Sequence, residues 1–295
     1  MFEFIYHLHQ KFTEAGLADP LQETLNLCDI LSGGALRGLD GRSPTQITPQ
    51  VSLEEIVQQR QQGVPLAYIL QQTVFMGRPF ICTPATLIPR AETELLVRTV
   101  LRHAATLPHD DLVIVDVGTG SGNIAVSLAL ALPNSRVFAL DISPEAAARA
   151  QEHVVQYNLQ GRVTVGIGDL FAPIAKLGLE KQVDVVVCNP PYIPSGSLEK
   201  LSAEITAHEP RVALDAGPYG INIFRRLVQE AQTFLRPGGV LAFEFGVGQA
   251  TLVEKLLQKK GGYTQMQTVN DQLGMARVFV AETADSEEFA GLPDD

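Results

Sequence analysis

A short proline-rich string offers the most specific chemistry in the chain. Asn189-Pro190-Pro191-Tyr192 directly follows an apolar run, Val183 to Cys188. The Asn189 side-chain oxygen and the Pro190 carbonyl can each accept one N–H of a planar amide or base amine, and so stabilise positive charge developing on that nitrogen. Tyr192 can stack on the same planar group, and the prolines stiffen the turn. The string therefore predicts methylation of a planar nitrogen, with Asn189, Pro190 and Tyr192 as catalytic residues and all four as substrate contacts; a proline-rich turn with a packed tyrosine is the alternative.

A glycine-rich loop precedes this string by some seventy residues. Gly118-Thr119-Gly120-Ser121-Gly122 follows Asp116-Val117 at the end of an apolar run and opens a helical stretch. Glycines at such a turn let the backbone approach a ligand closely. The Gly-x-Gly-x-x-Gly spacing of dinucleotide sites would need glycine at position 123, where the chain has asparagine. The loop therefore favours a cofactor other than a nicotinamide or flavin dinucleotide.

Carboxylates follow the next two expected strands. Asp141, with Ile142 beside it, ends the second strand about twenty residues after the glycines, where a carboxylate can accept from both hydroxyls of a ribose. Asp169 follows the third strand and can accept from the exocyclic amine of an adenine, with Leu170 or Phe171 against the ring. These residues predict a nucleoside-containing cofactor. The alternative for Asp141 is a plain helix cap.

Alternating strand and helix patterns position these motifs. Apolar strand-like runs alternate with helical stretches from about residue 112, which predicts an α/β fold with a doubly wound, mostly parallel sheet. The expected strands are 112–117, 136–140, 163–167, 183–188, 240–245 and 276–280, with helices at 123–132 and 144–157. Pro237-Gly238-Gly239 is expected to be the loop before the fifth strand, and 276–280 is placed at or near the closing end of the sheet. The carboxyl ends of parallel strands meet at one edge, so the motifs are expected together.

A smaller helical module precedes the sheet. Apolar residues recur at helical spacing from Phe2, Asp19-Pro20 has the form of a helix cap, and Ser52 with Glu55 has capping-box spacing. The first two helices are expected to stop at Gly16 and Gly33-Gly34, and strands at 73–76 and 80–83 form a hairpin. We expect a helical domain with its hairpin over 1–85, a cofactor-binding domain over 86–281, and an acidic, disordered tail over 282–295.

Composition limits the remaining possibilities. The 295 residues are 45% hydrophobic and 19% charged, with 33 acids against 22 bases for a net charge of −11, so the chain folds and carries no basic stretch that would attract nucleic acid. No apolar run approaches a membrane span and no signal sequence opens the chain, which favours a cytoplasmic protein. Three scattered cysteines and six histidines show no ligand spacing, so no metal site is expected.

The motifs together resemble a known family. The glycine loop, Asp141 and Asn189 to Tyr192 resemble class I S-adenosylmethionine-dependent methyltransferases, whose sheet is seven-stranded. Longer stretches are similar to the release factor glutamine methyltransferase family. The resemblance covers nearly the whole chain except the acidic tail; its segments are Pro65 to Ile69, Leu87 to Glu94, Asn189 to Pro194, Glu209 to Asp215 and Gly274 to Arg277.

The resemblance implies an activity, a cofactor and partners. It implies transfer of a methyl group from S-adenosyl-L-methionine to the side-chain amide nitrogen (N5) of the glutamine in the Gly-Gly-Gln motif of peptide chain release factors. It assigns cofactor contacts to Gly118 to Gly122, Asp141, Leu170 and Asn189, and substrate contacts to Asn189 to Tyr192. The helical module would help to dock the release factor. We expect a monomer with no membrane partner and no direct nucleic-acid substrate.

Four positions depart from the family pattern. Gln71 and Ala216 stand where glycine is usual, Ala91 replaces a proline, and Tyr219 stands where aspartate is common. These positions lie outside the methyl-transfer residues, so they bear on the substrate more than on the reaction. Arg90 and Glu92 belong to the Leu87 to Glu94 segment, where an ion-pair or helix-start role is as plausible as a site role.

Three alternatives stay open. A ribosomal protein glutamine presents the same amide to Asn189, and a nucleic-acid base presents a similar planar amine, although the latter needs phosphate-binding cations. Outside this chemistry, the chain would be a cofactor-binding module without catalysis.

Overall fold

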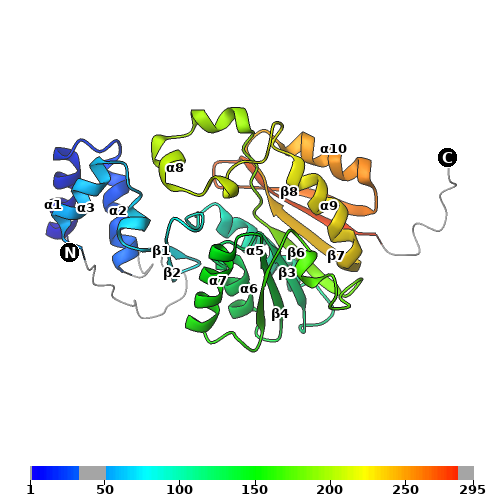
Figure 1. Ribbon diagram of the computed structural model, residues 1–295. Coiled ribbons are helices and arrows are strands. Elements are labelled where there is room, and N and C mark those ends of the chain that lie inside the picture. Colours follow the sequence, from blue (N-terminus) through cyan, green and yellow to red (C-terminus); the bar gives the residue numbers. More distant parts are fainter. Residues whose placement is uncertain (1, 33–50, 285–295) are drawn as a thin grey trace. The chain divides into compact units, whose positions relative to one another are not determined.

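The computed structural model describes residues 2–32 and 51–284 and divides into two compact units (Figure 1). The first unit comprises Met1–Arg90 together with Glu199–Arg211, and the second comprises Ala91–Leu198 with Val212–Asp295. The first unit thus ends five residues beyond the expected boundary at residue 85. It also takes in a segment from the second half of the chain, which nothing in the sequence pattern indicated.

The second unit is built on a seven-stranded, mostly parallel sheet. Its strand order is β5-β4-β3-β6-β7-β9-β8; the pairs from β5 to β7 are parallel, whereas β9 runs antiparallel to both β7 and β8. The doubly wound α/β architecture predicted from the alternating pattern is therefore confirmed. The strands are β3 (Val113–Val117), β4 (Arg136–Asp141), β5 (Val163–Ile167), β6 (Val183–Cys188), β7 (Leu235–Glu244), β8 (Tyr263–Asn270) and β9 (Ala276–Thr283).

Three features of the sheet differ from expectation. Strand β7 begins at Leu235, so Pro237-Gly238-Gly239 lies within it rather than in a loop before it. The edge strand is β8, which the sequence analysis did not identify, and β9 lies one strand inside that edge. Most β8 side chains alternate between exposed and half-buried positions, so β8 lacks the apolar run that marks a buried strand. Glu282 and Thr283, assigned to the acidic tail, belong to β9, and residues 285–295 lie outside the described residues.

Helices pack on the sheet in two groups. In the first group, α6 and α7 contact β4 and β5, and α5 packs beside α6 and against β7 (Figure 1). In the second group, α9 and α10 pack on each other. Helix α9 also contacts β7, and α10 contacts β8 and β9. A core of valines, leucines and phenylalanines fills this unit, including the stacked rings of Phe243 and Phe279. The helices are α5 (Thr93–Ala104), α6 (Asn123–Ala131), α7 (Pro144–Gln156), α9 (Asn222–Phe234) and α10 (Ala250–Lys260), with short 3₁₀ turns at Ala172–Ile174, Ser195–Lys200 and Arg211–Ala213.

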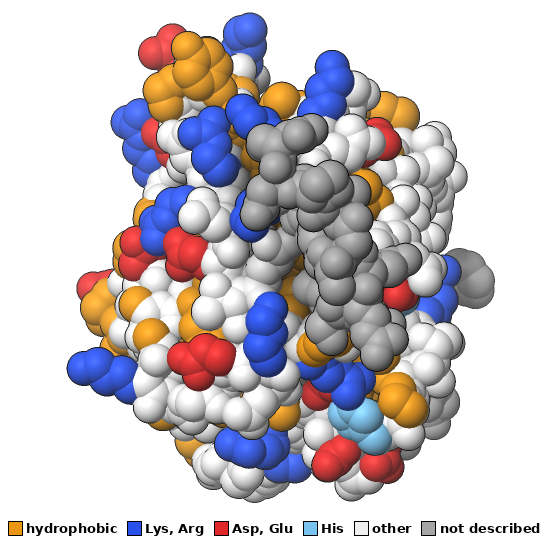
Figure 2. All heavy atoms as spheres, turned by 90° about the vertical axis from the view of Figure 1, so that its right-hand side faces the viewer, with side chains coloured by type: hydrophobic (Ala, Val, Ile, Leu, Met, Phe, Trp, Pro, Cys, Tyr) orange, Lys and Arg blue, Asp and Glu red, His pale blue; other side chains and the backbone are white. Residues whose placement is uncertain are grey.

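The surface shows mixed charges. On the face seen in Figure 2, several Lys and Arg side chains gather toward the upper left with acidic and apolar side chains among them, and others are scattered below. Within residues 2–32 and 51–284, the longest apolar helical segments fall short of what a bilayer crossing requires.

The first unit contains the three expected helices, a short fourth helix that was not expected, and the expected hairpin, whose second strand begins at Arg78 rather than at Phe80. Asp19 caps α2 by accepting from the Gln22 backbone N–H, and Ser52 and Glu55 form the predicted capping box of α3. Apolar side chains of α1 to α4 form a separate core. The predicted stop at Gly33-Gly34 lies outside the described residues. The elements are α1 (Phe2–Glu14), α2 (Pro20–Leu31), α3 (Leu53–Gln61), α4 (Leu66–Ile69), and the antiparallel pair β1 (Gln72–Phe75) and β2 (Arg78–Ile81).

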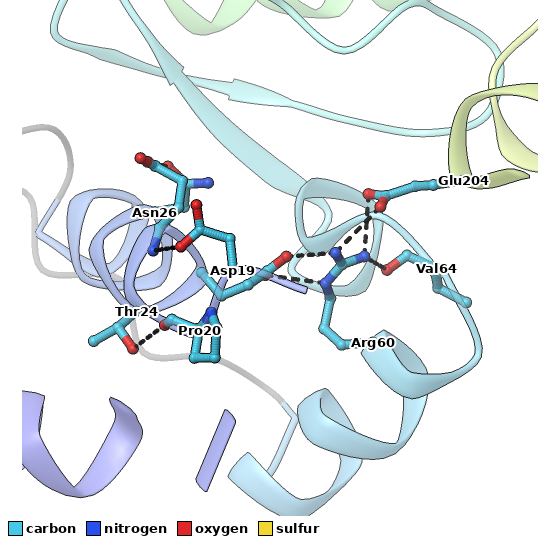
Figure 3. A network of polar contacts seen from close by, with 9 residues as sticks. Asp19, Pro20, Thr24, Asn26, Arg60, Val64 and Glu204 are labelled. Atoms are coloured by element: carbon cyan, nitrogen blue, oxygen red, sulfur yellow. Dashed lines mark hydrogen bonds and ion pairs between the residues drawn. The ribbon is translucent and has the colours of Figure 1, made fainter. Parts of the chain in front are cut away.

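Charged groups hold the segment Glu199–Arg211 within the first unit. This segment forms α8 (Ala203–His208). The nearly buried Arg60 of α3 donates to Glu204 of α8 at 3.1 and 3.2 Å, to Glu23 of α2 at 3.0 Å, and to the carbonyl of Val64 (Figure 3). The buried carboxylate of Glu209 accepts from the Ile88 backbone N–H at 3.3 Å. Buried charges require partners of this kind, so α8 is attached by specific contacts rather than by apolar packing alone.

Candidate active site

Strand order brings the predicted motifs to one edge of the sheet. The chain runs outward from β3 to β4 and β5 and then returns to β6, so the order reverses between β3 and β6, which are direct neighbours. Val117, the last residue of β3, pairs with Cys188, the last residue of β6. The glycine loop and the Asn189 string therefore emerge side by side at the switch point, where open α/β sheets bind ligands.

The glycine loop adopts a backbone that side chains disfavour. Gly118, Gly120 and Gly122 have φ angles of +69°, +57° and +78°. A Cβ on Gly118 or Gly120 would meet no protein atom within 4 Å, whereas one on Gly122 would come within 3.1 Å of Ala150 Cβ. The first two glycines therefore border open space, and the third allows close packing of the loop on α7.

Asp141 joins the end of β4 to this loop. Its Oδ2 accepts from the Gly120 N–H at 2.8 Å and its Oδ1 accepts from the Ser143 N–H at 2.9 Å. Burial raises the pKa of the Asp141 carboxyl, and these backbone donors partly oppose that change. The Ile142 N–H is a third backbone donor to this carboxylate. The helix that follows is capped by the Ser143 side chain, and the neighbouring Ile142 is exposed.

Asp116 lies beneath the loop and is fully buried. Its Oδ2 accepts from Thr119 Oγ1 at 2.6 Å and from the Ala125 N–H at 3.1 Å. No group in the described part of the chain donates to its Oδ1. Burial raises the pKa of Asp116 to about 7. The site thus contains a buried carboxylate with one acceptor atom left over.

The loop after β5 differs in part from expectation. Both oxygens of Asp169 accept from one guanidinium nitrogen of Arg226, at 2.9 and 3.1 Å, and its side chain is 49% exposed. Leu170 is buried with a φ of +46°. The Phe171 ring stacks on Phe234 within the core, with centroids 5.0 Å apart. Leu170 and Phe171 were the two side chains expected to contact a cofactor ring. Phe171 instead packs in the hydrophobic core.

The Asn189 string presents two unclaimed acceptors. Asn189 Nδ2 donates to Thr93 Oγ1 at 3.0 Å. Among the described residues, neither Asn189 Oδ1 nor the Pro190 carbonyl accepts a hydrogen bond. Tyr192 donates its hydroxyl to Glu244 Oε1 at 3.2 Å, and burial raises the pKa of Tyr192 to about 12, so the phenol stays protonated at neutral pH. The arrangement can accept two hydrogens from one planar group.

The turn after β7 supports the backbone of the same string. Gln249 donates through Nε2 to the Tyr192 carbonyl at 2.9 Å and accepts through Oε1 from the Gly246 N–H at 2.8 Å. Ile193 forms an isolated bridge with Asp215. The position of the string is thus held by contacts separate from those of the Asn189 side chain.

Sequence reasoning missed several residues that contact the predicted ones. Thr93 and Arg277 lie in segments recognised only through the family resemblance, and Glu244 and Gln249 carried no signal. His153 of α7 was also missed: its buried Nδ1 lies 2.7 Å from the Ser121 carbonyl, so this nitrogen carries the hydrogen. A polar residue on the buried stripe of a helix was the available signal for His153.

The positions that depart from the family pattern have structural explanations in part. Gln71 has a φ of +53°, a left-handed conformation that explains why glycine suits this position. Arg90 forms an ion pair with Glu209, and Glu92 occupies the N-cap position of α5. Ala216 is buried and Tyr219 is 76% exposed. Nothing in the structure explains the alanine at position 91.

Comparisons with known proteins agree with this geometry. A family model described as a methyltransferase domain matches residues 108–287. The chain is 44% identical to a release factor glutamine methyltransferase of Moorella thermoacetica, over 77% of this chain and 78% of the relative, and 41% identical to one of Geobacter sulfurreducens, over 76% and 75%. The hMettl16 catalytic domain is 16% identical with a TM-score of 0.54, over 70% of this chain and 76% of that one, which is a likeness of fold alone. The chain belongs to the release factor glutamine methyltransferase family.

Proposed function

We propose that this protein methylates the side-chain amide nitrogen (N5) of the glutamine in the Gly-Gly-Gln motif of peptide chain release factors, with S-adenosyl-L-methionine as methyl donor. The observation that carries the proposal is the pair of unclaimed acceptors, Asn189 Oδ1 and the Pro190 carbonyl, at the sheet edge beside the glycine loop. An amide nitrogen is a weak nucleophile because its lone pair is delocalised. Two acceptors aimed at its hydrogens orient it and stabilise the positive charge that develops there.

The residues of the glycine loop and the strand ends fit S-adenosylmethionine. The unpartnered Oδ1 of the buried Asp116 suits a cationic amino group, and the Asp141 carboxylate, at the end of β4 beside the glycine loop, suits a ribose diol. Gly118 and Gly120 leave open space beside the backbone. We include Thr119, Ser121, Gly122, Ile142, Asp169, Leu170 and Asn189 in the proposed cofactor site. When bound, the cofactor supplies an electrophilic methyl group.

Tyr192 and the prolines complete the substrate side of the proposed site. The Tyr192 hydroxyl is engaged by Glu244, which holds the ring in one orientation and leaves its face as the surface for a planar amide. Pro190 and Pro191 restrict the backbone, so the Pro190 carbonyl keeps its direction. These side chains select a planar group without contacting the rest of a protein substrate.

A protein substrate needs a further docking surface, because one glutamine offers little area for selection. We assign this role to the helical first unit, since the described part of that unit contains none of the proposed methyl-transfer residues. Its exposed apolar side chains, Tyr6, Leu21 and Leu25, are the candidate contacts.

Methylation of a nucleic-acid base is the second candidate, because a base amine presents a similar planar nitrogen to Asn189. A base substrate would bring phosphates that require a cluster of cations. The net charge of −11 favours a protein substrate instead.

The test is methyl transfer by the full chain. Purified protein is incubated with radiolabelled S-adenosylmethionine and, separately, with release factor, ribosomal protein and RNA, and the modified residue is located by mass spectrometry. We expect one methyl group on the motif glutamine. Asn189→Ala is expected to lower turnover by roughly a hundredfold or more, by analogy with the loss of an oxyanion-hole donor. The control is Asn134→Ala, at an exposed asparagine on the turn before β4. Label on RNA or ribosomal protein alone would contradict the proposed substrate.

A further inference from the structure

The side-chain amide of Asn189 has two ends of opposite polarity. Rotation of the amide by 180° exchanges Oδ1, an acceptor, with Nδ2, a donor. Only the orientation with Oδ1 toward the substrate can accept an amide hydrogen. We propose that Thr93 and Glu244 are positioning residues that hold the Asn189 amide with its oxygen toward the substrate. This inference rests on the proposed function for its catalytic consequence, but the hydrogen-bond chain itself lies within the second unit.

The chain of contacts joins three elements. Asn189, directly after β6, donates through Nδ2 to Thr93 Oγ1 at 3.0 Å, and Thr93, the first residue of α5, donates through Oγ1 to Glu244 Oε2 at 2.7 Å. Glu244 is the last residue of β7. Thr93 and Glu244 are each 2% exposed, so water does not compete for these groups.

The direction of donation along the hydrogen bonds from Asn189 to Thr93 to Glu244 follows from the number of hydrogens that these groups carry. A threonine hydroxyl has one hydrogen. Burial raises the pKa of Glu244, whereas the Thr93 and Tyr192 hydroxyls and the Arg277 guanidinium favour its ionised form, in which the carboxylate can only accept. Once the Thr93 hydrogen is donated to Glu244, the Thr93 oxygen can only accept from Asn189. The NH₂ end of the amide must therefore face Thr93, since the reverse orientation would place Oδ1 against another acceptor. Oδ1 is left on the side away from Thr93.

Glu244 also orients the other functional side chain of the string. Its Oε1 accepts from the Tyr192 hydroxyl at 3.2 Å, and a guanidinium nitrogen of Arg277 lies 3.7 Å from the same oxygen. The Arg277 guanidinium also lies 5.9 Å from the centre of the Tyr192 ring. The buried carboxylate of Glu244 thus orients two side chains: it orients Tyr192 by a direct hydrogen bond, and it orients Asn189 indirectly, through Thr93.

The backbone of the string does not depend on Thr93. Gln249 holds the Tyr192 carbonyl, and Ile193 pairs with Asp215, so removal of the Thr93 hydroxyl leaves these supports in place. A substitution at Thr93 therefore changes the orientation of an amide rather than the path of the chain.

The test compares Thr93→Val with two other variants. Valine keeps the shape of threonine without the hydroxyl, and Thr93→Ser keeps the hydroxyl. The matched control is Thr99→Val, at a second buried threonine of α5 whose Oγ1 accepts from Arg102 at 3.0 Å. We expect Thr93→Val to lower kcat at least about tenfold, with the cofactor Kd and the release-factor KM changed by less than about threefold. Thr93→Ser should recover most of the loss, and Thr99→Val should leave kcat unchanged.

A second readout does not depend on turnover. The side-chain NH₂ resonances of Asn189, identified by their absence in Asn189→Ala, are expected to be well resolved in the wild type and in Thr93→Ser. In Thr93→Val they should broaden or shift as the amide becomes free to rotate. Thr99→Val should leave them in place.

The outcomes separate the two proposals. If the wild type methylates no release factor, the proposed function fails, and the resonances alone then decide the inference about Asn189. If the wild type is active, an undiminished kcat in Thr93→Val overturns the inference. A lower kcat with unchanged Asn189 resonances also overturns it, because Thr93 would then act by another route.

Discussion

At the scale of single residues, the candidate site consists of side chains that bind the protein through one group and leave another for a ligand. Asn189 donates to Thr93 and leaves Oδ1, and Asp116 accepts through Oδ2 and leaves Oδ1. Tyr192 donates its hydroxyl to Glu244, and this contact fixes the orientation of its ring. Because the bound ends are buried or half-buried, the free ends are oriented before any ligand arrives, which reduces the entropy lost on binding.

Asp141 is expected to contribute to cofactor affinity through the ribose. Loss of two charge-assisted hydrogen bonds in Asp141→Ala should weaken S-adenosylmethionine binding by at least about tenfold. Calorimetry with the cofactor and with an analogue lacking both ribose hydroxyls checks the cause: the wild type should discriminate between the two ligands and the variant should not. Because Asp141 also holds the Gly120 and Ser143 N–H groups, circular dichroism must show that the variant is folded. Equal affinities for wild type and variant would remove Asp141 from the cofactor site.

Asp116 is expected to make stability depend on pH. Its pKa is about 7 in the folded chain against an ordinary value of 3.8, so the folded state retains a proton that the unfolded state has released. The free energy of unfolding should therefore fall as pH rises from about 4 to about 7, by at most about 1.4 kcal/mol per pH unit from this group. Asp116→Asn should flatten that fall, as measured by urea unfolding across this range. Asp110→Asn, at an exposed aspartate, is the control; parallel pH profiles for wild type and Asp116→Asn would contradict the assignment.

At the scale of elements, short turns decide where the functional groups lie. The turn from β3 to α6 carries the glycine loop. The end of β7 carries Glu244 to the Asn189 string, and the turn after it carries Gly246 and Gln249. A Cβ on Gly246 would come within 3.1 Å of the Tyr192 ring. The strands fix where these turns begin, and the glycines allow the turns to pack closely.

Gly122 should tolerate a side chain poorly, because alanine there combines a left-handed φ with a contact of 3.1 Å to Ala150. We expect Gly122→Ala to lower the free energy of unfolding by about 1–3 kcal/mol and to weaken cofactor binding. Thermal unfolding and calorimetry measure the two effects. Gly161→Ala is the matched control, since Gly161 has no positive φ and no atom within 4 Å of the added Cβ. Similar Tm values for both variants would show that the loop can relax.

At the scale of the whole molecule, the first unit is discontinuous in sequence. Glu199–Arg211 belongs to it, and Glu204 and Glu209 find their partners Arg60 and Arg90 there. Deletion of the N-terminal helices would remove Arg60 and leave Glu204 without this partner, so a truncated chain is a poor test of docking. Substitutions of exposed side chains test the docking proposal without breaking these ion pairs.

Combined substitution of Tyr6, Leu21 and Leu25 by serine should raise the KM for whole release factor by roughly tenfold, because exposed apolar anchors contribute most of the energy of a docking surface. The KM for a short Gly-Gly-Gln peptide should stay unchanged, since the peptide reaches only the methyl-transfer site. Steady-state kinetics with both substrates give the answer, and Val155→Ser, at an exposed valine of α7, is the control. An equal rise for protein and peptide would place the effect in the active site instead.

Local patterns accounted for much of the fold. The parallel strands of the sheet, the Asp19 cap, the Ser52 capping box and the first hairpin were predicted because short-range periodicity and turn chemistry specify them. Strand β8 was missed because an edge strand exposes part of its surface and needs no apolar run. The early start of β7 was missed because Pro237-Gly238-Gly239 has the composition of a loop.

The sequence by itself determined which strand ends carry the proposed site, because the glycine loop, Asp141 and the Asn189 string each lie directly after an apolar run. Only the tertiary structure decided what orients them. Thr93 lies 96 positions from Asn189 and Glu244 lies 151 positions from Thr93, so no local pattern could connect these three side chains. Contacts of this kind depend on strand order, which neighbouring residues do not encode; they arise when the return of the chain from β5 to β6 places β6 between β3 and β7.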